Sequence, residues 1–466
     1  MYQQSHLNTE LFPAQINALN AARGKKGWGH LLEQGLGKTL VTLCEFAEYL
    51  FSDEVDGWVV ICPNSLKMNW AMECTKHGLE VNTYVWPDVP EVSKMVKPFL
   101  VAVNYEAVAV GRAERYVEGV LKAYRCGITL DESVKIKNPE SEASRSCQRL
   151  KKNAKFTRIL SGAPMTQGPQ DLWTQLQFIG GISNSYLYSA FKSTFCRFGG
   201  YMNKQILGIK NEDALGKILK ECTFRAKKSE YMDLPKLYST RFVELTPAQK
   251  KHYQELQEDF YTIINGQEVS PDLILTKLLK LQQVSSGFVI SDTGVVEDLK
   301  GGTNKLKVLL ESFEETDQKI IIPAHFSHSI EKLKEALAKY NPQCIKGGMK
   351  GDEVEHQKHV FNNDKSCRAI ILQTQASKYG HTLLGTEEAG RCATMCFYEN
   401  TYSLDDRLQI EDRNNRIGQT LPCLYLDYIS SPIEKAVVQA LQYKKSLLEA
   451  VVDGVKRSKL PLDSKT

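Results

Sequence analysis

Short apolar runs bounded by glycine, proline or aspartate recur through the first 185 residues, and helical patterns fill the intervals between them. Runs of four to six apolar residues are typical of strands that are buried on both faces of a parallel sheet. The sequence therefore predicts an α/β domain of about 180 residues, with helices covering a parallel sheet. The expected strands are GWGHLLEQ (27–34), WVVICP (58–63), FLVAVNY (99–105), CGITLDES (126–133) and TRILSGAP (157–164).

The alternation of strand and helix patterns stops near residue 186 and resumes after Gly301 and Gly302. Between these points, apolar residues recur at helical spacing in two long segments, 245–264 and 273–284. Further strands are then expected at KIIIPAH (319–325), CRAIILQT (367–374), ATMCFYE (393–399) and LYLDYIS (424–430). We expect a first α/β lobe at 1–185, a helical insertion and linker at 186–300, a second α/β lobe at 301–455 and a polar tail at 456–466.

Composition narrows the class of protein but identifies no partner. The 466 residues are 42% hydrophobic, which is enough for buried cores. The 59 Lys and Arg nearly balance the 55 Asp and Glu, so the net charge of +4 does not by itself indicate a nucleic-acid partner. No apolar stretch approaches the roughly 18 residues of a membrane span, and the N-terminus lacks an export signal. We expect a cytoplasmic protein with no membrane partner.

Twelve cysteines are scattered along the chain, and none belongs to a CxxC pair. The closest spacing is Cys392 to Cys396, with no flanking histidine pair. Reduced thiols in the protein core are the favoured interpretation, and a zinc site is the alternative.

The segment EQGLGKT follows a strand pattern and precedes a helical one. Gly35 and Gly37 allow backbone N–H groups to turn inward around phosphates, and a helix N-terminus adds positive potential. Lys38 would reach the β- and γ-phosphates of ATP, and Thr39 would ligate Mg²⁺. We interpret the segment as a Walker A loop, or P-loop, with Leu32 in place of its first glycine. The alternative is a glycine-rich turn between a strand and a helix.

An acidic pair, Asp131 and Glu132, ends the apolar run GITL. Acidic residues at strand ends are often simple caps. The position behind a strand, in the same expected domain as the P-loop, favours a catalytic interpretation. Asp131 would hold Mg²⁺, and Glu132 would act as general base on the attacking water.

Phosphoryl transfer needs cationic groups beyond Lys38, and these often include an arginine from another element. Arg413 and Arg416 are three residues apart in QIEDRNNRIGQ and share one face if that segment is helical. They are candidate arginine fingers. The residues alone leave open an ordinary solvated helix face with Asp–Arg pairs.

Taken in order, these segments resemble the superfamily 2 helicase-like ATPases of the Swi/Snf type. EQGLGKT is similar to motif I of that family and QIEDRNNRIGQ to motif VI, and these two motifs are the specific ones. The resemblance covers nearly the whole chain and implies two RecA-like lobes that close on ATP. The other similar segments are LFPAQ (Q motif), VVICPNSLKMNW (motif Ia), DESVKIKN (motif II), LSGAPMTQGPQDLW (motif III), ECTFRAKKSEYMDLPKL with ELTPAQKKHY (linker), IIIPAHFSHSIEKL (motif IV) and ILQTQASKYGHTL (motif V).

The resemblance implies further roles. Gln15 would read adenine, Gly380 and Gln409 would contact ATP, and Arg413 and Arg416 would reach the γ-phosphate from the second lobe. Relatives of this type run along duplex DNA without separating its strands, so DNA is the expected partner, and any loading partner stays unidentified. A chain this compact looks more like the bacterial and viral members than like eukaryotic remodellers.

Two motifs depart from the family pattern. Val134 stands in motif II where relatives typically have histidine, so it cannot make the polar link to motif III that a histidine would make. Ser377 and Lys378 stand in motif V where relatives usually have two glycines, and Lys378 is a candidate for an added phosphate contact. Neither departure changes an expected catalytic residue, so we expect an active ATPase.

Small polar or cationic groups in two of the motifs are of the kind that contacts nucleic-acid phosphates. They are Ser65 and Lys67 in motif Ia and Thr374 at the end of the motif V strand, and each is also consistent with a solvated loop residue. Trp70 and Trp173 lie in apolar helical contexts, which favours core packing over base stacking.

Three functions stay open at this point. A duplex-DNA translocase is favoured, because motifs II and VI resemble the Swi/Snf set and no strand-separating wedge is evident. The alternatives are a strand-separating helicase on DNA or RNA, and an ATP-driven remodeller of protein complexes or nucleotide-switched scaffold. A scaffold would not need the full set of acid, base and arginine residues.

Overall fold

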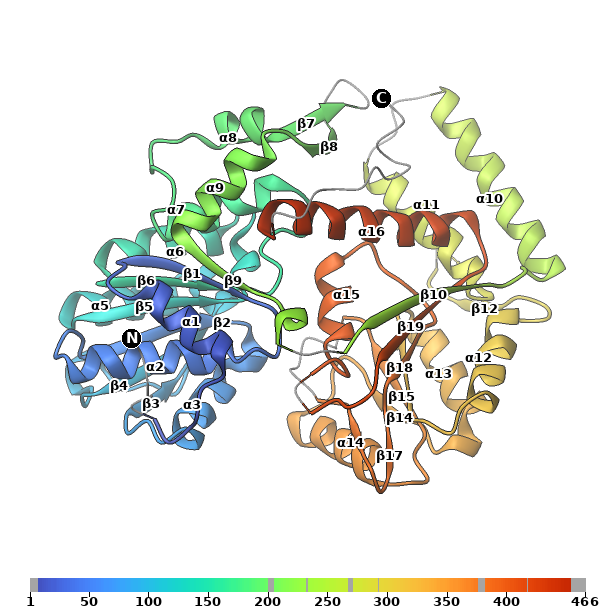
Figure 1. Ribbon diagram of the computed structural model, residues 1–466. Coiled ribbons are helices and arrows are strands. Elements are labelled where there is room, and N and C mark those ends of the chain that lie inside the picture. The colour runs from blue at the N-terminus through green and yellow to red at the C-terminus, as the bar shows by residue number, and fades with distance from the viewer. Residues whose placement is uncertain are drawn as a thin grey trace. The chain divides into compact units, whose positions relative to one another are not determined.

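The chain forms two compact units, each built around its own parallel sheet (Figure 1). The first unit comprises Met1–Asp233 and Tyr443–Thr466, and the second comprises Leu234–Gln442. This arrangement confirms the expected α/β fold with two parallel-sheet lobes. The computed structural model describes residues 7–199, 205–231, 234–266, 271–291, 293–375, 382–416 and 418–453.

The sheet of the first unit has the strand order β3-β4-β2-β5-β6-β1-β9, with every neighbouring pair parallel. Every residue of β2, β4, β5 and β6 is buried, which is why these strands are continuous apolar runs. The five strands expected in this part of the chain are confirmed. The strands are β1 (Gly27–Leu32), β2 (Gly57–Cys62), β3 (Asn82–Val85), β4 (Phe99–Asn104), β5 (Cys126–Asp131), β6 (Phe156–Leu160) and β9 (Thr223–Ala226).

Helices α1, α2 and α3 share a hydrophobic core with this sheet, in which Trp58 and Trp70 are the largest side chains. A separate hairpin joins β7 (Cys196–Gly199) to β8 (Gln205–Ile209). The helices of the unit are α1 (Pro13–Ala22), α2 (Lys38–Phe51), α3 (Lys67–Lys76), α4 (Tyr105–Ala109), α5 (Arg112–Ala123), α6 (Glu142–Leu150), α7 (Leu172–Phe178), α8 (Tyr188–Phe195) and α9 (Glu212–Cys222).

A buried ionic cluster connects β1, the strand before the P-loop, with α2, the helix after it. Glu45 on α2 pairs with His30 on β1 (Nε2 to Oε2, 2.8 Å) and accepts a hydrogen bond from Arg158 Nε on β6 (3.0 Å). All three side chains are at most 3% exposed. Burial opposes ionisation of Glu45, but the charges of Arg158 and His30 outweigh it and lower its pKa to about 2.

The sheet of the second unit has the order β10-β19-β18-β13-β15-β14 and is also parallel throughout. Helices α12 and α13 share one hydrophobic core with this sheet, and α14 and α15 share another. The strands are β10 (Lys236–Phe242), β13 (Ile320–Ala324), β14 (Gln343–Ile345), β15 (Ala369–Gln373), β18 (Thr394–Phe397) and β19 (Cys423–Ile429). The helices are α10 (Pro247–Gly266), α11 (Pro271–Ser285), α12 (Asn304–Glu314), α13 (Ser327–Ala336), α14 (Gly351–Asn363) and α15 (Leu404–Glu411). Helix α16 (Pro432–Val452) begins in this unit, and its residues from Tyr443 onward belong to the first unit.

Two small hairpins complete the second unit. They are β11 (Phe288–Ile290) with β12 (Val296–Asp298), and β16 (Gly385–Thr386) with β17 (Gly390–Arg391).

The boundary between the two units, at Asp233 and Leu234, falls within the segment 186–300 that is predicted as a helical insertion and linker. The long helical patterns of this segment do form α10 and α11, but β9 adds to the first sheet and β10 to the second. Both strands lie at sheet edges and keep part of their side chains exposed or half-buried. An edge strand does not need an apolar run, so the sequence pattern gave no signal for either one.

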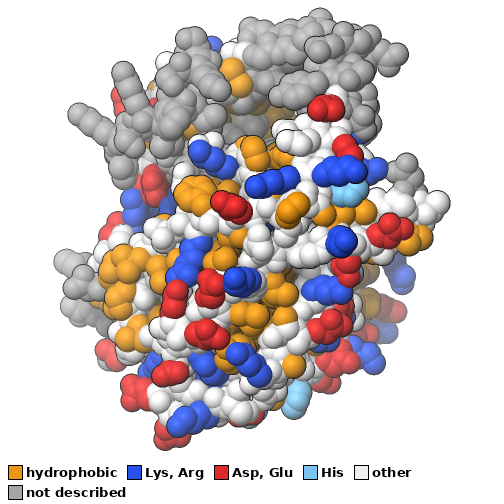
Figure 2. Space-filling model, turned by 90° about the vertical axis from the view of Figure 1, so that its right-hand side faces the viewer, with side chains coloured by type: hydrophobic (Ala, Val, Ile, Leu, Met, Phe, Trp, Pro, Cys, Tyr) orange, Lys and Arg blue, Asp and Glu red, His pale blue; other side chains and the backbone are white. Residues whose placement is uncertain are grey.

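The burial of the cysteines agrees with the expected thiols in the protein core. All twelve cysteines are buried and none forms a disulfide, and within the described ranges no cluster of three or more His, Cys, Asp or Glu is placed to hold a metal ion. On the face shown in Figure 2, positive and negative side chains are interspersed among apolar ones. None of the helices in the described part of the chain is both long and apolar enough to span a membrane.

Candidate nucleotide site

The P-loop joins β1 to α2 in the first unit. β1 ends at Leu32, and α2 begins at Lys38. Gly35 (φ 87°) and Gly37 (φ 79°) both adopt the left-handed conformation that glycine reaches without strain. Lys38 Nζ donates to the Leu32 carbonyl across the loop (3.3 Å). A loop of this form at a helix N-terminus offers N–H groups and positive potential to an anion.

Gln15 of α1 packs directly against the P-loop. Its side-chain amide donates to the Leu36 carbonyl (3.2 Å) and its oxygen accepts from the Phe12 N–H (2.9 Å). A Cβ atom on Gly37 would lie 2.1 Å from Gln15 Nε2, the end of a flexible side chain, so the φ of 79° is the stronger reason for glycine at this position. Gln15, which was predicted from the Q motif, therefore lies beside the predicted P-loop.

Asp131 ends β5 and is only 5% exposed. Trp70 Nε1 on α3 donates to its Oδ2 (3.0 Å), and the Glu132 N–H donates to its Oδ1 (3.0 Å). Burial raises the pKa of Asp131, while the charge of Lys38 and the two hydrogen bonds act in the opposite direction. The P-loop follows β1 and Asp131 ends β5, and these two parallel strands lie on either side of β6, so both segments lie at the same edge of the sheet.

The expected core position of Trp70 is confirmed, since the side chain is fully buried. Its hydrogen bond to Asp131 was not expected from the sequence. The only available signal was the place of Trp70 in the motif Ia segment, and no spacing rule connects that segment with β5.

Thr39 and Glu132 complete the first-unit part of the site. Thr39 is the second residue of α2 and is half-buried. Glu132 follows Asp131 with a φ of 50°, a conformation that a side chain other than glycine rarely adopts. Backbone strain of this kind costs about 1–3 kcal/mol and is concentrated at functional sites.

A polar link between motifs II and III exists, although Val134 does not provide it. Val134 is buried at 4% exposure, whereas Ser133 Oγ donates to Gln175 Oε1 on α7 (2.7 Å). Gln175 Nε2 in turn donates to the carbonyl of Pro164 in motif III (2.7 Å). The residue before Val134 thus reaches motif III through a glutamine.

Arg413 and Arg416 lie in the second unit, beyond the end of α15 at Glu411. They are therefore not two residues on one helix face, because the chain has already turned out of the helix. Arg413 is 2% exposed. Arg416 donates to the Asp412 carbonyl (2.8 Å) and to Thr382 Oγ1 (2.9 Å), and burial lowers its pKa against the effect of Asp412.

A buried charge network fixes α15, the helix that leads to these arginines. Arg407 pairs with Asp427 on β19 (2.5 Å) and with Glu411 one turn later (2.8 Å), and its guanidinium lies 3.4 Å from the centre of the Phe397 ring. The Tyr238 hydroxyl on β10 donates to Glu411 (2.7 Å). Side chains from three strands thus hold the end of α15.

The remaining ATP-site candidates also belong to the second unit. Gln409 is 8% exposed on α15, where its amide donates to Asp405 (3.1 Å). Gly380, together with Ser377 and Lys378, lies outside the described residues.

The three candidate phosphate contacts already have neighbours within the protein. Ser65 is half-buried in the short 3-10 turn Asn64–Leu66. Lys67 Nζ donates to the Trp86 carbonyl (2.7 Å), and Thr374 Oγ1, which is nearly buried, donates to the Ala324 carbonyl (3.0 Å). Thr374 has a single O–H donor, so a phosphate contact that it donates would replace this bond, whereas Lys67 Nζ keeps two further N–H donors.

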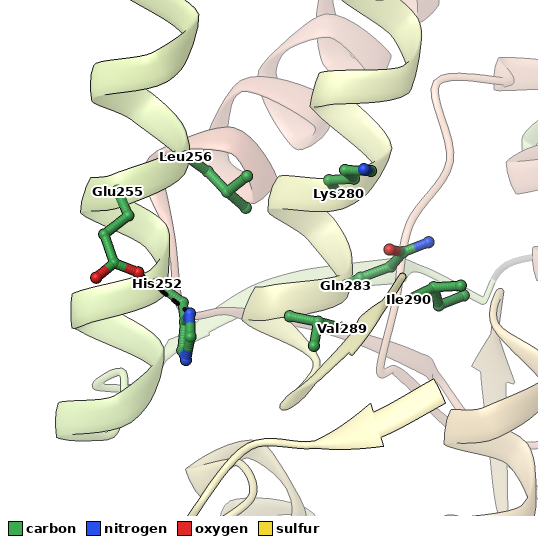
Figure 3. Close-up of a pocket in the computed structure, with 7 residues that line it drawn as sticks. All are labelled: His252, Glu255, Leu256, Lys280, Gln283, Val289 and Ile290. Carbon is green, nitrogen blue, oxygen red and sulfur yellow. Dashed lines mark ion pairs between the residues drawn. The ribbon is translucent and has the colours of Figure 1, made fainter. Parts of the chain in front are cut away.

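A pocket of about 240 Å³ lies in the second unit between α10, α11 and β11 (Figure 3). His252 Nδ1 and Glu255 Oε2 lie 3.3 Å apart on its α10 side. None of its lining residues is a candidate from the sequence. They are His252, Glu255, Leu256, Lys280, Gln283, Val289 and Ile290.

Comparison with known proteins points to one family. The SNF2-related domain matches residues 22–287. The SWI/SNF chromatin-remodeling complex subunit snf22 of Schizosaccharomyces pombe is 24% identical over 91% of this chain. The ATP-dependent DNA helicase DDM1 of Arabidopsis thaliana is 26% identical over 91% of it. This chain spans 26% and 58% of the lengths of these two relatives.

A solved structure, the SWI2/SNF2 ATPase core of Sulfolobus solfataricus in complex with double-stranded DNA, is 24% identical. That comparison covers 97% of this chain and 95% of that chain, with a TM-score of 0.44. The domain match at residues 22–287 includes both the P-loop and the Asp131–Glu132 pair. Since it covers more than half of the chain, the chain belongs to the SNF2-related domain family.

Proposed function

We propose that this chain is an ATP-hydrolysing motor of the Swi/Snf type that moves along duplex DNA without separating its strands. One observation supports the proposal more strongly than the others do. The left-handed glycines of the P-loop place Lys38 at the start of α2, where its charge acts on the buried carboxylate of Asp131. A glycine-rich turn with no ligand would have no need of a buried acid beside its lysine.

In the first unit, the P-loop N–H groups and Lys38 bind the phosphates of ATP, and Gln15, which contacts the loop, reads the adenine. Glu132 takes a proton from the attacking water. The residues also fit a magnesium ion, because Asp131 is a buried acid whose ionised form needs a nearby cation, and Thr39 offers a hydroxyl at the same helix end. When bound, Mg²⁺ would neutralise charge on the β- and γ-phosphates.

In the second unit, Arg413 and Arg416 stabilise the charge that develops on the γ-phosphate when the two units close on ATP. Their burial supports this role, since a desolvated guanidinium acts on a phosphate more strongly than one in water. The charge network around Arg407 keeps the end of α15 fixed. Gln409 and Gly380 are proposed as further ATP contacts.

The relatives support DNA as the partner, because their names describe a subunit of a chromatin-remodelling complex and a DNA helicase. Ser65, Lys67 and Thr374 are the proposed backbone contacts. Such groups position a protein on DNA without reading its sequence. An interspersed surface charge is compatible with a motor that holds DNA through a few local contacts.

The rate of ATP hydrolysis separates the candidate functions when it is measured alone and with duplex DNA, single-stranded DNA or RNA. We expect hydrolysis that duplex DNA stimulates most. Stimulation by single strands or RNA alone would favour the strand-separating helicase. An equal rate in all four conditions would favour a remodeller of protein complexes and would contradict the proposal.

A further inference from the structure

Arg225 on β9 contacts both β1, the strand that precedes the P-loop, and motif III. Its Nη1 donates to the carbonyl of Leu31, at the end of β1 (3.0 Å), and to the carbonyl of Gly162 in motif III (2.8 Å). The side chain is 13% exposed. A guanidinium carries five N–H donors in one rigid plane, so a single arginine can hold two carbonyls at a fixed spacing.

Motif III packs tightly on the P-loop at the same place. A Cβ atom on Gly162 would lie 3.0 Å from Gln34 Cγ and 3.2 Å from the Gln34 backbone nitrogen. The backbone of motif III at Gly162 therefore lies close against the backbone of the P-loop at Gln34. Arg225 donates to the Gly162 carbonyl and is therefore placed to hold motif III and the P-loop in a fixed relative position.

The first residue of the P-loop joins this arrangement. Glu33 accepts a hydrogen bond from the Lys228 N–H (2.8 Å) and lies 3.5 Å from Arg225 Nη2. The Glu33 N–H donates to the carbonyl of Ala226 (3.0 Å). Contacts with β9 and with the residues that follow it therefore hold the first residue of the P-loop in place.

Arg225 also contacts the residue that follows α16, Asp453. Arg225 Nε donates to Asp453 Oδ1 (2.8 Å), and Asp453 directly follows α16. Lys227 Nζ pairs with the other carboxylate oxygen of Asp453 (3.0 Å), and that carboxylate is 4% exposed. Residues from Tyr443 onward belong to the first unit, so these contacts all lie within one unit.

We propose that Arg225 is a positioning residue of the nucleotide site, which sets the spacing between the P-loop and motif III, and that Asp453 fixes its orientation. ATP binding then depends on a docked C-terminal end of α16. The P-loop part of the inference rests on the proposed ATPase function. Lys227 provides a contrast, because it pairs with the same carboxylate but has no bond to the P-loop or motif III among the described contacts.

The test measures amide hydrogen exchange in the P-loop, residues 33–38, without nucleotide, and then the affinity for a fluorescent ATP analogue. Arg225→Lys keeps the charge but loses the planar set of donors, and Asp453→Ala removes the acceptor for Arg225 Nε. Both variants are expected to exchange faster in the P-loop and to bind the analogue about tenfold more weakly, the loss for one charge-assisted hydrogen bond. Lys227→Gln, the matched control, is expected to behave like the wild type.

Wild-type exchange and affinity in Arg225→Lys would overturn the inference. So would a Lys227→Gln variant as impaired as Asp453→Ala, because docking of α16 through charge would then explain the effect without Arg225. Exchange that rises throughout the unit, instead of in the P-loop and motif III, would also overturn it by indicating general destabilisation. If the wild type binds no ATP, the proposed function fails, but the exchange measured without nucleotide still decides the role of Arg225.

Discussion

At the scale of single residues, the ionisation of Asp131 depends on the charge of Lys38. Asp131 is a buried acid, and the hydrogen bonds from Trp70 and the Glu132 backbone only partly compensate its burial, since its pKa stays raised. The charge of Lys38 works against that rise. A bound cation would add to the same effect, which is why the pair suits a site for a nucleotide and its metal.

Lys38→Ala is therefore expected to abolish ATP turnover. It removes the phosphate contact and also the charge that lowers the pKa of Asp131, so this pKa rises further. Steady-state phosphate release measures the effect. Lys26→Ala, an exposed lysine in the same unit, is the control and should keep the wild-type rate. Turnover by Lys38→Ala at the wild-type rate would contradict the assignment of the P-loop.

Glu132→Gln is expected to bind ATP normally and to hydrolyse it about 10²- to 10⁴-fold more slowly, the usual contribution of a general base. The amide keeps the size of the side chain but cannot accept the proton. Single-turnover hydrolysis and equilibrium binding separate the two effects. A wild-type rate in this variant would show that another group takes the proton.

At the scale of secondary-structure elements, the Glu45 cluster holds β1, α2 and β6 together. Glu45→Gln leaves the fully buried Arg158 without its charged partner, which costs about 3–5 kcal/mol of unfolding free energy. Urea denaturation at pH 7 measures this loss. The control is Glu48→Gln, in the exposed pair with Arg23, which should cost at most about 1 kcal/mol.

The same cluster predicts a pH dependence. The pKa of Glu45 falls from its ordinary 4.5 to about 2 in the folded protein, so its ionisation stabilises the fold above about pH 4.5. That stability is lost as pH falls from about 4.5 to 2. The gap in unfolding free energy between wild type and Glu45→Gln should therefore narrow over this range. A constant gap would contradict the pairing.

The link from Ser133 through Gln175 to motif III predicts a separation of two activities. Ser133→Ala should reduce the stimulation of ATP hydrolysis by duplex DNA more than it reduces the rate without DNA. Ser146→Ala is the matched control, because Ser146 is an equally buried serine that bonds Glu114 instead. Equal stimulation in both variants would mean that the link does not couple hydrolysis to DNA.

The sequence predicted the buried parallel strands and the P-loop because each has a strong local pattern. Apolar runs identified nine strands, and the Gly-x-Gly-Lys-Thr pattern identified the loop that Gln15 contacts. It did not predict β9 or β10, which lie at sheet edges and lack such runs. Nor did it predict the bonds from Trp70 to Asp131 and from Ser133 to Gln175, because tertiary packing alone joins those segments.

At the scale of the whole molecule, the groups that we propose act on ATP are divided between the two units. Lys38, Asp131 and Glu132 belong to the first unit, and Arg413 and Arg416 belong to the second. A division of this kind lets hydrolysis drive a change between two arrangements of the units. The net charge of +4 fits such a motor, which must release DNA in every cycle and gains little from a strong overall field.

Displacement of a third DNA strand from a triplex tests the motor directly, because the third strand leaves when a protein moves along the duplex beneath it. We expect wild-type protein with ATP to release the third strand while a forked duplex stays paired, and Lys38→Ala to release nothing. ATP hydrolysis without release of the third strand, or ATP-dependent separation of the forked duplex, would contradict translocation along intact duplex DNA.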